Sequence, residues 1–202
     1  RAGGQVASAI AAQQVSAAST GSDLAAGIEP GDILAASMRQ ARAVLDAAAA
    51  ADETLQKLGT TAIALYWDPA ASATVAQVGD SMAYRFVESY LGAISTPHRS
   101  TDPATLGKLT QHLGAGQLSP KQLEPVTLRV HNGARFVLCT DGVWDLASKT
   151  DAGFEELERR LALPDLAEAA AETLAHVFAL GATDNATAII LEFRLEPAVT
   201  GL

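Results

Sequence analysis

The sequence predicts an α+β fold, an antiparallel β-sandwich flanked by helices on both faces. Two Ala-rich helical segments open the chain, several β-branched and aromatic segments follow, and two more helical patterns precede a last apolar segment. This order differs from the strict alternation of strands and helices that a parallel sheet requires. We therefore expect the first two helices to cover one sheet and the later helices to cover the other.

Helical periodicity and end signals predict the helices. In the first, Val6 and Ile10 recur at helical spacing, and in the second Asp32 stands where an N-cap belongs. Pro164 near the first turn and Gly181 after the last turn delimit the C-terminal helix. We expect helices at residues 5–18, 32–51, 103–112, 151–162 and 164–180.

Runs of β-branched and aromatic residues, separated by turn signals, predict the strands. The segments "DPAAS" and "GDS" are interpreted as the turns of two hairpins, and Asn-Gly at 132–133 as the turn of a third. Residues 96–124 are polar and rich in turn formers, so we expect them to leave the core. Strands are expected at 59–69, 72–80, 82–89, 90–95, 125–130, 134–142 and 185–193, the last of them buried.

Composition limits the possible functions. The 202 residues are 49% hydrophobic and 18% charged, which is typical of a globular chain. The net charge of −9 argues against nucleic acid as a partner, although metal ions could still attract a phosphorylated protein. The one cysteine, Cys139, cannot form an internal disulfide, and no apolar run is suited to span a bilayer. We therefore expect a cytoplasmic location.

Three acids occupy the same local setting, where a predicted strand begins or ends. Asp80 ends "ATVAQVGD", Asp141 ends "RFVLCTD" and Asp184 precedes "NATAIILEF". Each one alone could serve a turn or cap a helix. Together they indicate carboxylates gathered at one rim of the β core, where oxygen ligands suit Mg²⁺ or Mn²⁺ better than Zn²⁺. We expect all three to converge, with Asp141 and Asp184 close enough to share one ion.

Three further patterns for phosphoryl or nucleotide chemistry do not fit the residues. A cysteine nucleophile with a phosphate-binding loop would need an arginine six positions later, where Cys139 has Asp145. An aspartyl-phosphate enzyme would need Asp-x-Asp, but Asp141 is followed by Gly142 and Val143. No P-loop pattern is present. The sequence therefore contains none of these three patterns.

Four segments carry a family resemblance: "LGTTAIAL", "ATVAQVGDSMAY", "FVLCTDGVWDLAS" and "GATDNATAIILEF". In order and spacing they resemble the metal-dependent Ser/Thr protein phosphatases of the type 2C (PPM) family, bacterial type. "RAGGQVASAIAAQQV" is similar to the helix after that family's Asp-Gly-x-Gly-Gly motif. The resemblance implies a single PPM-type phosphatase domain over residues 1–202. It also implies that this domain is N-terminally incomplete, without the metal-bridging aspartate, an upstream acid and a phosphate-binding arginine.

The resemblance implies roles for individual residues. Asp141 and Asp184 would bind one metal of the catalytic pair, and Asp80 would help to hold a third ion that some members carry. Asn185 and Gly142 would support these ligands from outside the coordination shell. The cofactors implied are two Mn²⁺ or Mg²⁺ ions, or three. Met82 replaces the usual arginine of "GDSR", and the 96–124 segment is shorter than the usual flap, so substrate recognition there stays open.

The implied function is hydrolysis of phosphoserine and phosphothreonine in proteins by a metal-bound water. Its partner would be a phosphorylated protein, either in signal transduction opposite a Ser/Thr kinase or in a bacterial stress response. The alternative is a catalytically inactive phosphatase-like binding or regulatory module. Retention of Asp80, Asp141 and Asp184 favours the enzyme, whereas the isolated 202-residue chain is expected to be nearly inactive without the bridging aspartate.

Overall fold

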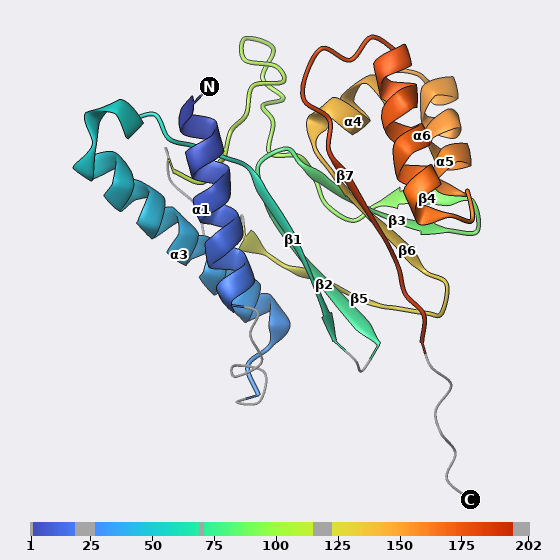
Figure 1. Cartoon of the computed structure of the whole chain (residues 1–202), viewed down its shortest axis with the longest axis horizontal. Coiled ribbons are helices and arrows are strands. Elements are labelled where there is room, and N and C mark those ends of the chain that lie inside the picture. Colours follow the sequence, from blue (N-terminus) through green and yellow to red (C-terminus); the bar gives the residue numbers. More distant parts are fainter. Residues whose placement is uncertain (1, 19–26, 69–70, 115–122, 196–202) are drawn as a thin grey trace, which may run out of the picture. The chain divides into compact units, whose positions relative to one another are not determined.

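The computed structural model describes residues 2–18, 27–68, 71–114 and 123–195 (Figure 1). Among the described helices, none has the length and hydropathy needed to cross a membrane. The helices are α1 (Ala2–Ala18), α3 (Pro30–Ala51), α4 (Asp141–Ala147), α5 (Asp151–Leu161) and α6 (Leu166–Ala179), with a 3-10 turn at Glu53–Leu55. The strands are β1 (Ala62–Asp68), β2 (Ser72–Val78), β3 (Met82–Val87), β4 (Tyr90–Ala93), β5 (Val126–Arg129), β6 (Arg135–Cys139) and β7 (Ala188–Glu192).

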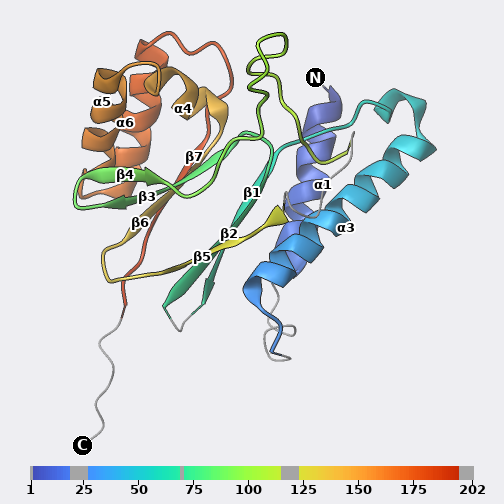
Figure 2. The same ribbon diagram turned by 180° about the vertical axis from the view of Figure 1, so that it is seen from behind.

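The strands form two sheets, with the order β1-β2-β5 in one and β4-β3-β6-β7 in the other (Figure 2). The prediction of an α+β fold with antiparallel sheets is confirmed. In the second sheet β6 and β7 are antiparallel, and Cys139 at the end of β6 lies opposite Ala188 at the start of β7. This register brings the residues that follow β6 next to those that precede β7.

The chain divides into two compact units. The first comprises Arg1–Tyr66, Thr74–Met82 and Ser95–Thr127, and the second comprises Trp67–Ala73, Ala83–Ile94 and Leu128–Leu202. The first unit therefore contains Asp80, and the second contains Asp141 and Asp184.

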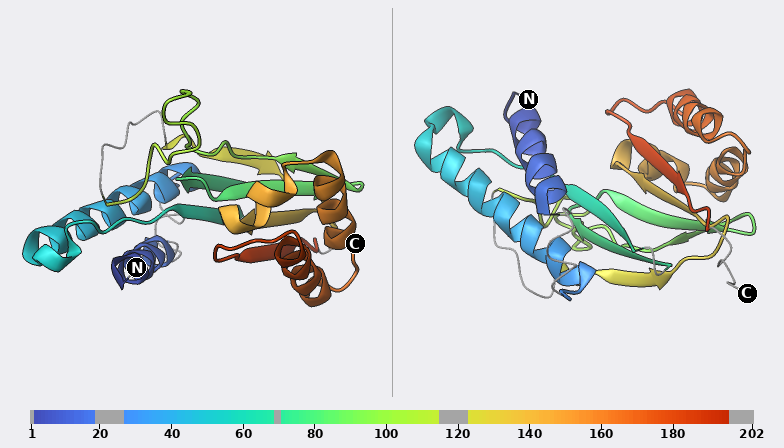
Figure 3. Two further views of the ribbon diagram at one scale, coloured as in Figure 1. Left: turned by 90° about the horizontal axis from the view of Figure 1, so that it is seen from above. Right: turned by 60° about the horizontal axis from the view of Figure 1, so that its bottom comes forward.

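The core of the first unit lies between two helices and β2. α1 and α3 lie side by side (Figure 3), and the small Ala7 and Ala11 of α1 let the helices approach closely. Their apolar faces pack with β2, as expected for the first two helices and the strands that follow them. The largest buried side chains of this core are Leu34, Met38, Leu45, Leu58, Val78 and Leu113.

In the second unit α5 and α6 pack against each other, and α6 also packs against β7. Buried Arg135 of β6 ties the helical layer to the sheet, since its guanidinium pairs with Glu192 at 2.8 Å and donates to the carbonyls of Leu161 and Leu163 at 2.6 Å. The ring of Phe136 meets Phe193 edge-on, with centroids 5.2 Å apart. The predicted helices at 151–162 and 164–180 are therefore confirmed, with slightly shorter bounds.

Two of the three predicted hairpins are wrong. The hairpin at "DPAAS" agrees with the structure, since β1 and β2 are neighbours in one sheet. β2 and β3 lie in different sheets, as do β5 and β6, so the chain passes from one sheet to the other at "GDS" and at Asn-Gly. Both sides of β6 are already taken by β3 and β7, and the amide of Gly133 donates to Phe193 at 2.8 Å. Turn residues therefore do not by themselves show that the flanking strands pair.

Three further predictions need correction. Residues 103–112 form turns instead of a helix, and an isolated bridge joins Arg99 to Leu109. The strand expected to run to residue 142 ends at Cys139, and the unpredicted helix α4 begins at Asp141. The last strand, β7, was expected to be buried, but it lies at the edge of its sheet and none of its residues is fully buried.

Candidate metal site

Asp141 and Asp184 line the same cavity of the second unit. This cavity has a volume of about 170 Å³, and α4 and the loop before β7 form its walls. Its lining residues are Asp141, Gly142, Asp145, Leu146, Lys149, Gly181, Ala182, Thr183 and Asp184. The structure thus brings together two of the three acids that the sequence singled out.

Hydrogen bonds of the Thr140 main chain and hydroxyl group connect the two walls. The amide of Thr140 donates to the carbonyl of Thr187 at 3.0 Å, and the amide of Thr187 donates to Thr140 Oγ1 at 3.0 Å. Thr140 Oγ1 also contacts the carbonyl oxygen of Asn185 at 3.4 Å. Because Thr140 directly precedes Asp141 and Asn185 directly follows Asp184, these contacts fix the spacing of the two carboxylates.

Each carboxylate is oriented by the next residue. Oδ1 of Asp141 accepts from the amide of Gly142 at 2.9 Å, and Oδ1 of Asp184 accepts from the amide of Asn185 at 2.8 Å. The contacts described for Asn185 run through its main chain, so it supports Asp184 without using its side-chain amide. Gly142 has a second role, because a Cβ there would overlap the carbonyl oxygen of Asn185 and lie 3.2 Å from Cα of Ala186.

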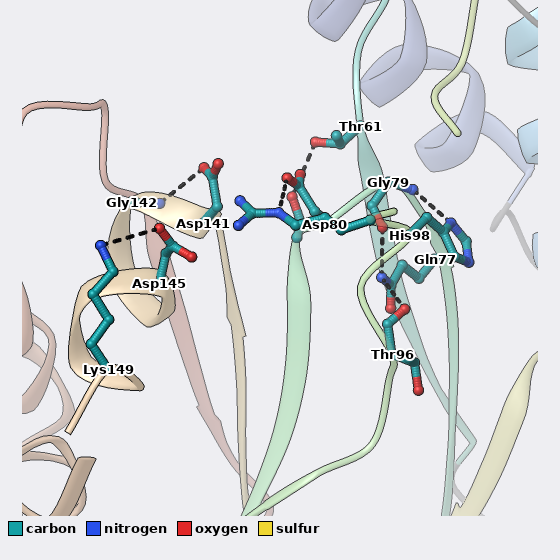
Figure 4. A network of polar contacts seen from close by, with 12 residues as sticks. Thr61, Gln77, Gly79, Asp80, Thr96, His98, Asp141, Gly142, Asp145 and Lys149 are labelled. Carbon is teal, nitrogen blue, oxygen red and sulfur yellow. Dashed lines mark hydrogen bonds and ion pairs between the residues drawn. The ribbon is translucent and has the colours of Figure 1, made fainter. Parts of the chain in front are cut away.

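The charges lining the cavity attract cations. Asp141, Asp145 and Lys149 recur at intervals of four residues, so they share one face of α4 and the turn after it (Figure 4). The Nζ of Lys149 lies 3.9 Å from Oδ2 of Asp145. Three formal carboxylate charges, with Asp184 included, against one ammonium leave two negative charges. A divalent cation would neutralise them.

The donors fit a hard, hydrated ion. Carboxylate oxygens suit Mg²⁺ and Mn²⁺, and Mg²⁺ commonly keeps several waters while one or two carboxylates hold it. Within residues 2–18, 27–68, 71–114 and 123–195, no group of three or more His, Cys, Asp or Glu side chains is placed to enclose a metal. The cavity therefore offers Asp141 and Asp184 as part of a coordination shell that water and substrate oxygens would complete.

Asp80 has a different environment in the first unit. It follows β2, and its Oδ2 accepts from Nε of Arg99 at 2.8 Å. Both side chains are largely shielded from solvent, with 14% of the aspartate and 20% of the arginine exposed. The prediction that Asp80 joins the other two acids stays a prediction. Sequence reasoning missed Arg99 because 19 residues separate it from Asp80.

Sequence reasoning also missed the part of α4 that lines the cavity. It gave neither Asp145 nor Lys149 a role in the site. The available signal was the spacing of Asp141, Asp145 and Lys149 by four residues, which is informative only if the segment is helical. Because a strand was expected to run to residue 142 and the next helix to begin only at residue 151, this spacing went unused.

Cys139 lies just before the cavity, and its environment disfavours the thiolate. It is 4% exposed, and burial raises the pKa of its thiol to about 12, with the nearby charge of Asp141 adding to the effect. The reactive form of cysteine is the thiolate. This agrees with the interpretation that no thiol intermediate takes part in the chemistry.

We expect Cys139 to resist alkylation in the folded protein. At pH 8 a thiol with this pKa is ionised in about one molecule in ten thousand, and burial also blocks access. Iodoacetamide labelling followed by mass spectrometry should find little adduct in native buffer and complete modification in guanidinium chloride. Rapid labelling of the native protein would contradict the buried position.

Comparison with known proteins agrees with these features. The sequence profile of the family described as Protein phosphatase 2C matches residues 1–179. No curated protein matches the chain.

Solved structures share the fold. The serine/threonine phosphatase PstP/Ppp of Mycobacterium tuberculosis has a TM-score of 0.81 at 20% identity, covering 96% of this chain and 84% of that one. The catalytic domain of PstP in complex with two manganese ions has a TM-score of 0.69 at 23% identity, covering 90% and 79%. The phosphatase MsPP of Mycobacterium smegmatis in complex with cacodylate has a TM-score of 0.67 at 22% identity, covering 92% and 81%.

The profile match spans most of the chain, and the α+β architecture with two antiparallel sheets agrees with it. The chain belongs to the protein phosphatase 2C family.

Proposed function

We propose that this protein hydrolyses phosphoserine and phosphothreonine in other proteins with the help of Mn²⁺ or Mg²⁺. The observation that carries the proposal is the pairing of Asp141 and Asp184 in one cavity with an excess of negative formal charge. Family membership supports it, as does the structural relative that holds two manganese ions. Another structural relative, MsPP, was solved in complex with cacodylate, which is an oxyanion.

In this proposal Asp141 and Asp184 hold the ion. A bound divalent ion would supply Lewis acidity to the phosphoryl oxygens and a nucleophilic water at neutral pH. The amides of Gly142 and Asn185 keep one oxygen of each carboxylate in place. Because this support comes from the main chain, the ligands need little reorganisation when an ion binds.

Lys149 contributes the positive charge at the edge of the same cavity. Its side chain is 61% exposed, and its pairing with Asp145 at 3.9 Å is long. An exposed pair of this kind is worth little, about 1 kcal/mol or less, so the ammonium can turn toward an anionic substrate at small cost. The substrate is proposed to be a phosphorylated cytoplasmic protein whose kinase this enzyme opposes.

The test is metal-dependent dephosphorylation by the protein at its natural length. Phosphate release from phosphoserine and phosphothreonine peptides should require Mn²⁺ or Mg²⁺ and should stop on addition of EDTA. Isothermal titration should also detect Mn²⁺ binding without substrate. Binding of phosphopeptide without turnover in saturating Mn²⁺ would favour the inactive binding module instead.

A further inference from the structure

The ion pair between Asp80 and Arg99 is built into the first unit. Its 2.8 Å contact joins a carboxylate and a guanidinium that are mostly shielded from solvent. A shielded pair differs from a surface pair because each charge, left alone, would have lost its hydration without compensation. Arg99 therefore compensates the charge of Asp80 with a group from the protein itself.

Hydrogen bonds made by neighbouring residues determine where Arg99 lies. Its neighbour His98 donates from its amide to the carbonyl of Gly79 at 2.9 Å, and the amide of Gly79 donates to Nδ1 of His98 at 3.0 Å (Figure 4). The side-chain amide of Gln77 donates to the carbonyls of Gly79 at 2.8 Å and Thr96 at 3.0 Å. These bonds fasten the segment that carries Arg99 to the turn that carries Asp80.

We propose that the guanidinium of Arg99 pairs with the carboxylate of Asp80 in place of a divalent ion. The protein then binds no ion through Asp80. The proposal rests on the proposed function, because it concerns how many ions that chemistry uses. An ion at Asp80 would have to share the carboxylate with a fixed guanidinium, where like charges repel. Otherwise it would have to break the 2.8 Å contact between Arg99 and Asp80, two groups that are mostly shielded from solvent. In this respect Asp80 does not fit the metal role that the family resemblance implies.

The experiment counts bound Mn²⁺ by isothermal titration and locates it through variants of Asp80 and Arg99. Asp80→Asn should bind the same number of ions as the parent protein, with Kd values within about twofold. Arg99→Gln should gain one additional weak ion, and the double variant Asp80→Asn/Arg99→Gln should lose it again.

Two controls separate charge from folding. Arg99→Lys keeps a positive charge and should gain no ion, whereas Arg129→Gln removes an exposed charge elsewhere and should leave the count unchanged. Circular dichroism checks that each variant is folded. Loss of an ion in Asp80→Asn, or no gain in Arg99→Gln, would overturn the proposal. If the parent binds no Mn²⁺ at all, the proposed function itself fails.

Discussion

Replacing Asp141 by asparagine should weaken Mn²⁺ binding and slow phosphopeptide hydrolysis by about 100-fold or more. Replacing a residue that only supports a metal ligand typically lowers metal affinity or activity 10- to 100-fold. The effect should be at least as large for Asp141, because it is proposed as a ligand itself. The amide keeps the shape of the carboxylate but removes the negative charge and one anionic oxygen. Titration calorimetry would measure the Kd for Mn²⁺. Initial rates across a series of Mn²⁺ concentrations would measure the loss of hydrolysis.

Asp151→Asn is the matched control, since Asp151 is an exposed acid at the start of α5 and lies outside the cavity lining. It should change neither Mn²⁺ affinity nor rate by more than about twofold, because an exposed charge there is worth only a fraction of a kcal/mol. Equal activity of Asp141→Asn and the parent at saturating Mn²⁺ would show that the site is assigned to the wrong residues.

The elements that sequence reasoning placed well are those with strong local signals. α3 was identified by its helical periodicity, which brings Met38 and Leu45 to its buried face. Its N-cap is Glu29 and not the predicted Asp32, so the helix begins two residues earlier than expected, at Pro30. The strands β2 and β3 were likewise identified, because β-branched and aromatic side chains suit a pleated surface.

Strand pairing was less predictable because it depends on partners distant in sequence. The amide of Gly133 could have closed a hairpin, but it donates to Phe193, 60 residues later. Likewise, "TDG" after a buried strand is consistent with both a turn and the first turn of a helix. The structure has the helix, with Thr140 in extended conformation before it.

Sequence patterns predicted the type of site, a metal site with carboxylate ligands, but identified only some of the residues that line it. Strand-end acids identified Asp141 and Asp184, and the antiparallel pairing of β6 with β7 explains why they meet. Asp145, Lys149 and Arg99 needed the three-dimensional structure. The first two depend on a helix that the sequence did not reveal, and the third depends on a contact across 19 residues.

Gly142→Ala should lower the stability of the protein by about 2 kcal/mol, which for a chain of this size is a fall in Tm of about 5 °C. Gly142 lies in helix α4, where alanine is ordinarily better than glycine by up to about 1 kcal/mol. Here the new methyl group would overlap the carbonyl oxygen of Asn185 and lie 3.0 Å from its carbonyl carbon. Main-chain atoms cannot move aside as a flexible side chain can. A loss of stability in Gly142→Ala, instead of the gain expected for an ordinary helix position, would therefore be evidence for this contact.

The same substitution should also lower Mn²⁺ affinity by about tenfold, because pushing the Asn185 loop away moves Asp184 relative to Asp141. Gly181→Ala is the matched control at the other wall of the cavity. Its φ of 91° makes alanine strained by about 1 kcal/mol, but its Cβ would meet nothing within 4 Å. Thermal melts with and without Mn²⁺ should therefore show a reduced Mn²⁺-induced rise in Tm for Gly142→Ala and a normal rise for Gly181→Ala. A stabilised Gly142→Ala with unchanged Mn²⁺ affinity would mean that the two walls do not lie as close as the structure places them.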